Sequence, residues 1–171
     1  MTEHGPLDSL LGSCAVEGTG PSFMCALRDL IASPGGRPGV GLPDHVRSVL
    51  ELYALWSDIG AEGMWKYLEE WGVGADFDQI REWCRRIGAL TTVDYLDATG
   101  AVFPGGRVIV DDEERRRFVD RLGFRVPDPL RQCDDKYREV AVKEIPTRLH
   151  AYLSSHHDEL AAWLARAPSD D

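Results

Sequence analysis

Long apolar runs and paired cysteines are both missing from this sequence, and each absence excludes a class of protein. No apolar stretch approaches the roughly 20 residues that a membrane-spanning helix needs, so we expect no membrane partner. The four cysteines are widely separated and form no CxxC pair, which argues against a zinc ribbon or a redox site. The N-terminus, MTEHGPLDSLLGSCAVEG, lacks the positive start and apolar core of a signal peptide. We therefore expect a cytoplasmic protein with free thiols.

Motifs of catalytic and cofactor-binding sites are also absent. No serine lies in a GxSxG motif, and no cysteine has the local signature of a nucleophile. The stretch SPGGRPGVGLP at residues 33–43 superficially resembles a phosphate-binding loop, but no GK[ST] follows it. His150 and His157 are seven residues apart, whereas zinc ligands on one helix are three or four apart. We therefore predict no enzyme, no cofactor and no metal site, and a hydrolase or metalloenzyme is the least supported hypothesis.

Basic residues are scarce relative to acidic ones. The chain has 19 Lys and Arg against 29 Asp and Glu, a formal net charge of −10. The excess is concentrated in residues 43–103, where eleven acidic and five basic residues leave a net charge of −6. An acidic surface repels nucleic acid and anionic membranes, so we expect no direct nucleic-acid binding and favour a basic partner. Solubility is the simpler interpretation of the same charge.

Apolar residues recur at helical spacing along most of the chain, which predicts an all-α fold with one compact multi-helix domain. Four consecutive helices are expected between Asp44 and Phe103, and this stretch contains four of the five tryptophans. Gly88 is expected to end the third of them. Later helices are predicted after Asp111, a suitable N-cap residue, from about residue 129, and again from Pro146. The run 108–110 is β-branched and is expected to be extended.

The N-terminal part of the chain is rich in glycine and proline and weakly patterned. Residues 1–20 are expected to be loop, and residues 21–32 a short amphipathic helix that begins with proline. Residues 33–43 contain three prolines and four glycines and are expected to be a linker. The predicted organisation is an N-terminal extension at 1–42, an all-helical domain at 43–167 and a polar tail at 168–171.

The acidic residues of the second and third core helices are the candidate binding surface. Adjacent carboxylates on a helix point about 100° apart, so they do not form an acid–base pair, and an exposed acidic face is the default. Trp56, Trp65 and Trp83 lie on apolar stripes and are expected in the core. Trp71, which follows Glu69 and Glu70, is expected to be partly exposed. The arginine run at 115–117 follows several acids and is interpreted as a solvated helix face. The candidate partner-binding residues are Glu62, Glu69, Glu70, Trp71, Asp76, Asp78 and Glu82.

Several short motifs occur in an order that resembles a known family. They are Leu50-Glu51, Trp65-Lys66-Tyr67-Leu68, Ile87-Gly88-Ala89, Phe103-Pro104 and Asp134-Asp135-Lys136-Tyr137. This order, over about residues 42–156, is similar to the bacterial all-helical domain of unknown function typified by a DNA-mimic protein. One departure lies in the turn at residues 59–64, where the family commonly has Asn-Gly-Gly-Phe and this chain has IGAEGM.

The resemblance implies an all-α fold, a homodimer, no known catalytic activity, and binding to a DNA-binding protein through carboxylates that imitate DNA phosphates. Phosphates along one strand rise about 3.4 Å per nucleotide, and carboxylates one helix turn apart are separated by about 5.4 Å, so a helix can imitate a sparse subset of phosphates. Lys66, Arg81, Arg85 and Arg86 dilute the acidic face. The alternative is an immunity- or adaptor-type protein that binds its partner by shape and aromatic contacts. Charge reversal of Glu69 and Glu70 separates the two hypotheses.

Overall fold

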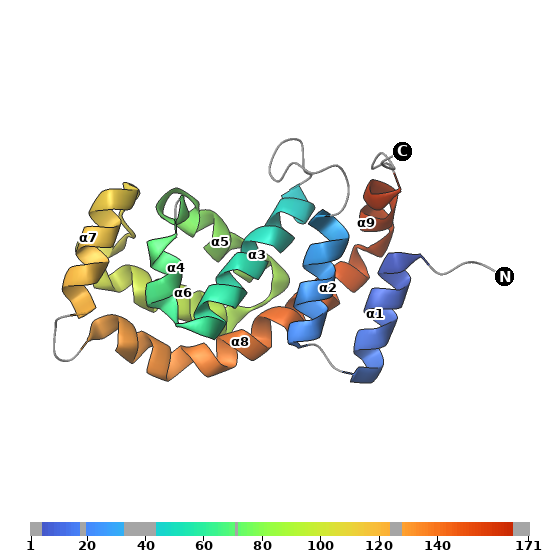
Figure 1. The fold of residues 1–171 in the computed structure, drawn as a ribbon, viewed down its shortest axis with the longest axis horizontal. Helices are drawn as coiled ribbons and strands as arrows, with labels where there is room; N and C mark the ends of the chain where they lie inside the picture. The colour runs from blue at the N-terminus through green and yellow to red at the C-terminus, as the bar shows by residue number, and fades with distance from the viewer. Residues whose placement is uncertain (1–4, 18–19, 33–43, 71, 124–127, 166–171) are drawn as a thin grey trace. The chain divides into compact units, whose positions relative to one another are not determined.

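The described part of the chain is helical. The computed structural model describes residues 5–17, 20–32, 44–70, 72–123 and 128–165. Within these ranges there is no β-strand, so the predicted all-α fold is confirmed (Figure 1). No helix in these ranges is both long enough and apolar enough to cross a membrane. The predicted linker at 33–43, the tail at 168–171 and Trp71 lie outside the described residues.

The described residues form nine α-helices and one 3₁₀ helix. In chain order they are α1 (Pro6–Glu17), α2 (Pro21–Ala32), α3 (Asp44–Ala61), α4 (Met64–Glu69), α5 (Val73–Ile87), α6 (Leu90–Val102), the 3₁₀ helix η1 (Pro104–Gly106), α7 (Asp112–Gly123), α8 (Pro129–Ser155) and α9 (His157–Leu164). The helices predicted for α2 and for α4 to α6 agree with this order. The predicted cap at Asp111 is also present, because its carboxylate accepts the Glu114 amide at 2.8 Å. Gly88 adopts a left-handed conformation with φ of 78° and ends α5 as expected.

The chain divides into two compact units. The first comprises residues 1–53 and 146–171, and the second comprises residues 54–145. Helices α3 and α8 each run through a boundary between the units. The predicted domain limits at residues 42 and 167 follow a different division and stay a prediction.

The first unit contains a helix where the sequence predicts a loop. Helix α1 occupies Pro6–Glu17, so the expectation of a loop over residues 1–20 is wrong for that span. Proline suits the first turn of a helix, and the Asp8 carboxylate accepts the Gly5 amide at 2.8 Å. The helix is only weakly amphipathic, which is why its periodicity is hard to detect. Leu7 is buried, and α1 packs against α2.

The second unit carries the predicted acidic surface. Helix α4 packs against α5 and α7, and α5 packs against α6. Trp83 is buried as expected, whereas Trp56 and Trp65 are only partly buried. The core of this unit is formed by apolar side chains that include Leu55, Ile59, Met64, Leu68, Phe77, Ile80, Leu96, Val119, Leu122 and Leu130.

Helix α8 continues through a proline that the sequence suggests as the start of a new helix. Pro146 lies inside α8, so the expectation of a helix beginning there is wrong. Proline has no N–H, so the carbonyl four residues earlier loses its helical donor. That carbonyl belongs to Val142, and it accepts the indole N–H of Trp56 at 3.0 Å. Because the Trp56 indole replaces the missing donor, α8 can continue past Pro146.

Candidate acidic partner-binding surface

The predicted surface residues lie on three consecutive elements of the second unit. Glu62 follows α3, Glu69 and Glu70 lie at the end of α4, and the remaining acids belong to α5. Glu62 and the α5 acids are exposed, whereas Glu69 and Glu70 are partly buried. Trp71, the aromatic member of the predicted set, lies outside the described residues. The exposed acids of α5 are Asp76, Asp78 and Glu82.

Two of the three acids on α5 are paired with arginines of the same helix. Asp78 lies 3.3 Å from Arg81, and Glu82 lies 3.5 Å from Arg85. Both arginines also approach Asp97 on α6, at 3.0 and 3.8 Å. Exposed pairs of this kind contribute little to stability, but they reduce the negative potential of the helix face. The α5 part of the predicted surface is therefore largely neutralised.

A denser group of acids lies near Lys66, and we call it, together with the lysine, the Lys66 cluster: Asp58, Glu62, Lys66, Glu69 and Glu70. The Lys66 ammonium lies 2.9 Å from a Glu70 carboxylate oxygen. The hydrogen bond to Glu70 raises the pKa of Lys66, and the charges of Glu69 and Asp58 add to this. Burial raises the pKa of Asp58, and the negative charges of Glu70 and Glu62 raise it further. Three carboxylates thus act on one lysine, and Glu62 acts on Asp58, so the cluster keeps an excess of negative charge.

Asp58 is a member that the sequence prediction missed. It lies in α3, four residues before Glu62, so the two side chains share a helix face. The Glu62 amide donates to the Asp58 carbonyl at 3.0 Å, which continues the helical turn as far as Glu62. The four-residue spacing of two like charges is the sequence signal that identifies this pair.

Arg115 at the start of α7 fixes the backbone that carries Glu69 and Glu70. Its side chain is fully buried, so the predicted solvated arginine face is wrong at this position. Its Nε donates to the Leu68 carbonyl at 2.8 Å, and its Nη2 donates to the Glu70 carbonyl at 2.6 Å. The planar guanidinium presents several donors in a fixed geometry, which suits it to hold several carbonyl groups at once. Arg117, by contrast, is exposed and lies 3.8 Å from Glu113, as the four-residue spacing predicts.

Two neighbours of Arg115 complete this contact, and together we call Asp112, Arg115 and Arg116 the α7 clamp. The Nε of Arg116 donates to the Glu69 carbonyl at 2.6 Å. The Asp112 carboxylate accepts the Gly72 amide at 3.1 Å, next to the start of α5. The hydrogen bond from Arg115 holds the pKa of Asp112 below its usual value. The clamp therefore holds the main chain on both sides of the turn between α4 and α5.

Other carboxylates of the second unit are used to cap helices. Asp134 accepts the Met64 amide at 2.9 Å at the start of α4, and it also accepts the hydroxyl of Tyr95. Glu144 accepts the amides of Thr91 and Thr92 at 3.2 and 2.8 Å at the start of α6. Negative side chains at helix N-termini satisfy free amides and complement the helix dipole. These acids stabilise the fold and are not free for a partner.

The buried ionisable groups of this unit are poorly suited to nucleophilic chemistry. Burial raises the pKa of the Cys84 thiol to about 12. Burial, with the hydrogen bond to Asp134, raises the pKa of Tyr95 far above its usual value. Within the described ranges, no group of three or more His, Cys, Asp or Glu side chains is arranged to hold a metal ion.

The motifs that carry the family resemblance lie in this unit and at its margins. Residues 41–156 match a family model described as DMP19-like protein. The chain belongs to the DMP19-like protein family. DMP19 is a DNA-mimic family, so the resemblance predicted from the sequence is confirmed. No curated protein and no solved structure matches the chain.

The DMP19-like motifs have clear structural roles here. Asp134 of the Asp-Asp-x-Tyr element caps α4, and Tyr137 stacks on Tyr95 with ring centroids 5.9 Å apart. Gly63, in the turn that departs from the family pattern, has φ of 92°, and a Cβ at this position would collide with Asp134. The departing turn is therefore fitted to the same capping aspartate. Helices α1 and α9 lie outside the residues that match the family.

Proposed function

We propose that the protein is a non-enzymatic acidic protein that binds a basic or DNA-binding protein, with the Lys66 cluster at the centre of its binding surface. The observation that carries this proposal is a group of four neighbouring carboxylates with a single lysine: Asp58, Glu69 and Glu70 act on Lys66, and Glu62 acts on Asp58. Membership of the DMP19-like family supports a partner that normally binds DNA. In such a complex, the carboxylates would meet the basic side chains that contact phosphates on DNA.

The ion pairs rank the residues of the predicted surface. Glu62 and Glu69 form no ion pair within the described residues and are expected to contribute most. Glu70 and Asp58 add negative charge but share Lys66. Asp76 extends the surface along α5, whereas Asp78 and Glu82 are expected to contribute little, because their charges are already balanced by Arg81 and Arg85. A binding role for Trp71 stays a prediction.

The α7 clamp supports this proposal because it limits the motion of the binding residues. The carbonyls of Glu69 and Glu70 both accept hydrogen bonds from arginines of α7. A surface that is ordered before binding loses less conformational entropy in the complex. The clamp would therefore favour affinity as well as stability.

Two double variants test the proposal with equal changes of charge. The partner is first captured on the immobilised chain from a lysate of the source cells, identified by mass spectrometry and purified. Its affinity is then measured for Glu62→Gln with Glu69→Gln, and for Asp78→Asn with Glu82→Gln. The first pair should weaken binding about tenfold and the second by less than about threefold, since only the first removes unbalanced charge. Duplex DNA should compete with the chain for the partner.

Equal losses for the two double variants would contradict the role of the Lys66 cluster. Binding that neither double variant weakens and that salt does not affect would favour the alternative, an adaptor- or immunity-type protein that uses shape and aromatic contacts. A homodimer and a cytoplasmic location stay predictions. Light scattering of the purified chain tests the first, and fractionation of the source cells tests the second.

A further inference from the structure

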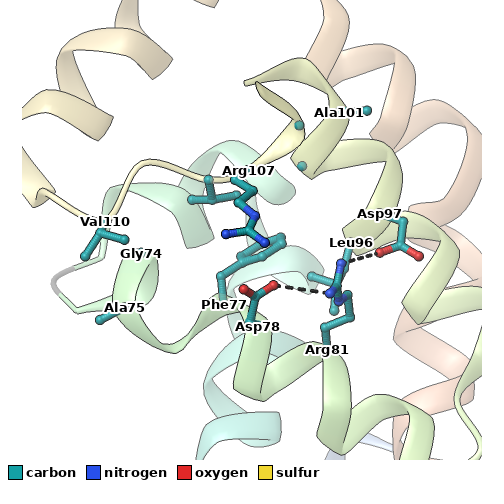
Figure 2. Close-up of a pocket in the computed structure, with 13 residues that line it drawn as sticks. Gly74, Ala75, Phe77, Asp78, Arg81, Leu96, Asp97, Ala101, Arg107 and Val110 are labelled. Atoms are coloured by element: carbon teal, nitrogen blue, oxygen red, sulfur yellow. Dashed lines mark hydrogen bonds and ion pairs between the residues drawn. The ribbon is translucent and has the colours of Figure 1, made fainter. Parts of the chain in front are cut away.

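A cavity of about 410 Å³ lies in the second unit (Figure 2), and no residue of the Lys66 cluster lines it. It is bordered by α5, α6 and the segment 106–110. Pockets for small molecules typically measure about 300–1,000 Å³ and combine an apolar lining with a few polar groups. This cavity has the size and the mixture of surfaces of such a pocket.

The base of the cavity is apolar. Phe77, Leu96 and Val108 line it, and all three side chains are buried. Gly74 and Gly100 also line it, and a Cβ on Gly74 would collide with the Ile109 carbonyl. Glycine at position 74 lets the backbone of the segment 106–110 approach α5 closely. An apolar body of a ligand would find partners on this base.

The charges around the cavity leave one positive group without a partner. Asp78 and Asp97 are both held by Arg81, at 3.3 and 3.0 Å. Arg107 has no carboxylate within ion-pair distance in the described part of the chain. Figure 2 shows its side chain directed from the segment after η1 towards Phe77 and Asp78. The group free to bind a ligand is therefore a guanidinium, which favours an anion.

A second polar group at the cavity also lacks a partner. The Nε of Arg81 is buried and finds no acceptor among the described residues, although the terminal nitrogens of the same side chain are bound. A buried donor without an acceptor costs about 1–3 kcal/mol, so an unmet group of this kind marks a place where an oxygen is expected. Arg81 lines the cavity, but its Nε has almost no accessible surface, so Arg107 is the positive group that a ligand can reach.

We propose that this cavity binds a small organic acid with one carboxylate and a compact apolar body. The carboxylate would pair with Arg107, and the apolar body would contact the accessible parts of Phe77, Val108 and Val110. A single negative charge fits best, because the carboxylates of Asp78 and Asp97 at the same cavity would repel a more highly charged anion. This site is independent of the proposed partner and is tested without it.

The test is a titration of the full-length, ¹⁵N-labelled chain with benzoate and with hexanoate, followed by amide NMR. At least one acid should produce saturable shifts confined to residues around the cavity, and benzamide, which lacks the charge of benzoate, should bind about tenfold more weakly. Arg107→Gln should weaken binding about tenfold, and Ala101→Leu should weaken it by filling the cavity. Arg131→Gln is the matched control, since Arg131 is exposed on α8 and does not line the cavity.

Three outcomes would overturn the proposal. The first is the absence of saturable shifts with both acids in the unmodified chain. The second is equal binding by Arg107→Gln and Arg131→Gln. The third is benzamide binding as tightly as benzoate. Dispersed amide spectra establish that each variant is folded, so a loss of binding is assigned to the site.

Discussion

Replacement of Arg115 by methionine should destabilise the protein more than any change to its neighbouring arginines. The side chain is fully buried, and its guanidinium donates to the carbonyls of Leu68, Glu70, Ile109 and Val110 at 2.6 to 3.3 Å. It also pairs with Asp112. Methionine fills a similar volume but donates no hydrogen bond. Loss of one partner of a buried charged pair costs about 3–5 kcal/mol, which is a large share of a typical domain's stability.

Urea unfolding followed by tryptophan fluorescence and circular dichroism measures this effect. Arg117→Met is the matched control: Arg117 and Glu113 are 70% and 77% exposed, so its loss should cost no more than about 0.5 kcal/mol. Arg115→Lys keeps the charge without the planar fork, and it should give an intermediate loss. A loss of less than about 1 kcal/mol in Arg115→Met, or one equal to that in Arg117→Met, would refute the reasoning.

Two further predictions follow from single side chains. Trp56→Phe should lower the free energy of unfolding by about 1 kcal/mol, because the Val142 carbonyl loses the donor that compensates for Pro146. Trp65→Phe is the control because Trp65 makes no hydrogen bond through its indole in the described structure, and equal losses would contradict the role of Trp56. Iodoacetamide at pH 8 should label the partly exposed Cys25 at least about tenfold faster than Cys84, whose buried thiol has its pKa raised to about 12. Peptide mass spectrometry measures both rates, and rapid labelling of Cys84 in the folded chain would contradict the burial argument.

Local pattern was enough to predict most of the helices. Helix α5 is the clearest case, because its apolar stripe of Phe77, Ile80, Trp83 and Ile87 is buried throughout. Gly88 ends that helix in the left-handed conformation that a terminal glycine favours. Periodicity and a capping residue are both local, so a sequence displays them directly.

The errors of prediction arose where a distant residue supplies what the local sequence lacks. Pro146 removes a donor from α8, and Trp56, which is 86 residues from the acceptor at Val142, replaces it. Arg115 follows four acids and therefore resembles a surface residue, but its main partners are carbonyls 45 and 47 residues earlier. No local spacing reveals such contacts, because they depend on how α7 packs against α4.

The same distinction separates the two parts of the candidate surface. The pairs Asp78–Arg81 and Glu82–Arg85 have three-residue spacing, so their neutralisation is visible in the sequence. The Lys66 cluster is less visible, because Asp58 joins Glu69 and Glu70 from a different helix. The sequence predicts seven residues for the acidic surface, and the folded chain shows which of the six described acids have their charge balanced by nearby bases. The role of all seven in binding stays a prediction.

The use of carboxylates inside the fold changes how the net charge of −10 bears on partner binding. Asp112, Asp134 and Glu144 accept hydrogen bonds from amides at the start of helices, so their negative charge stabilises the fold and is less available to a partner. A mimic of phosphates needs carboxylates that are exposed and not balanced by nearby bases, because only these attract a partner's lysines and arginines. The net charge counts structural and exposed carboxylates equally, so it overstates the negative charge that is available to a partner. The carboxylates of the Lys66 cluster should therefore control affinity for the partner. Variants elsewhere that change the net charge by the same amount should have little effect on that affinity.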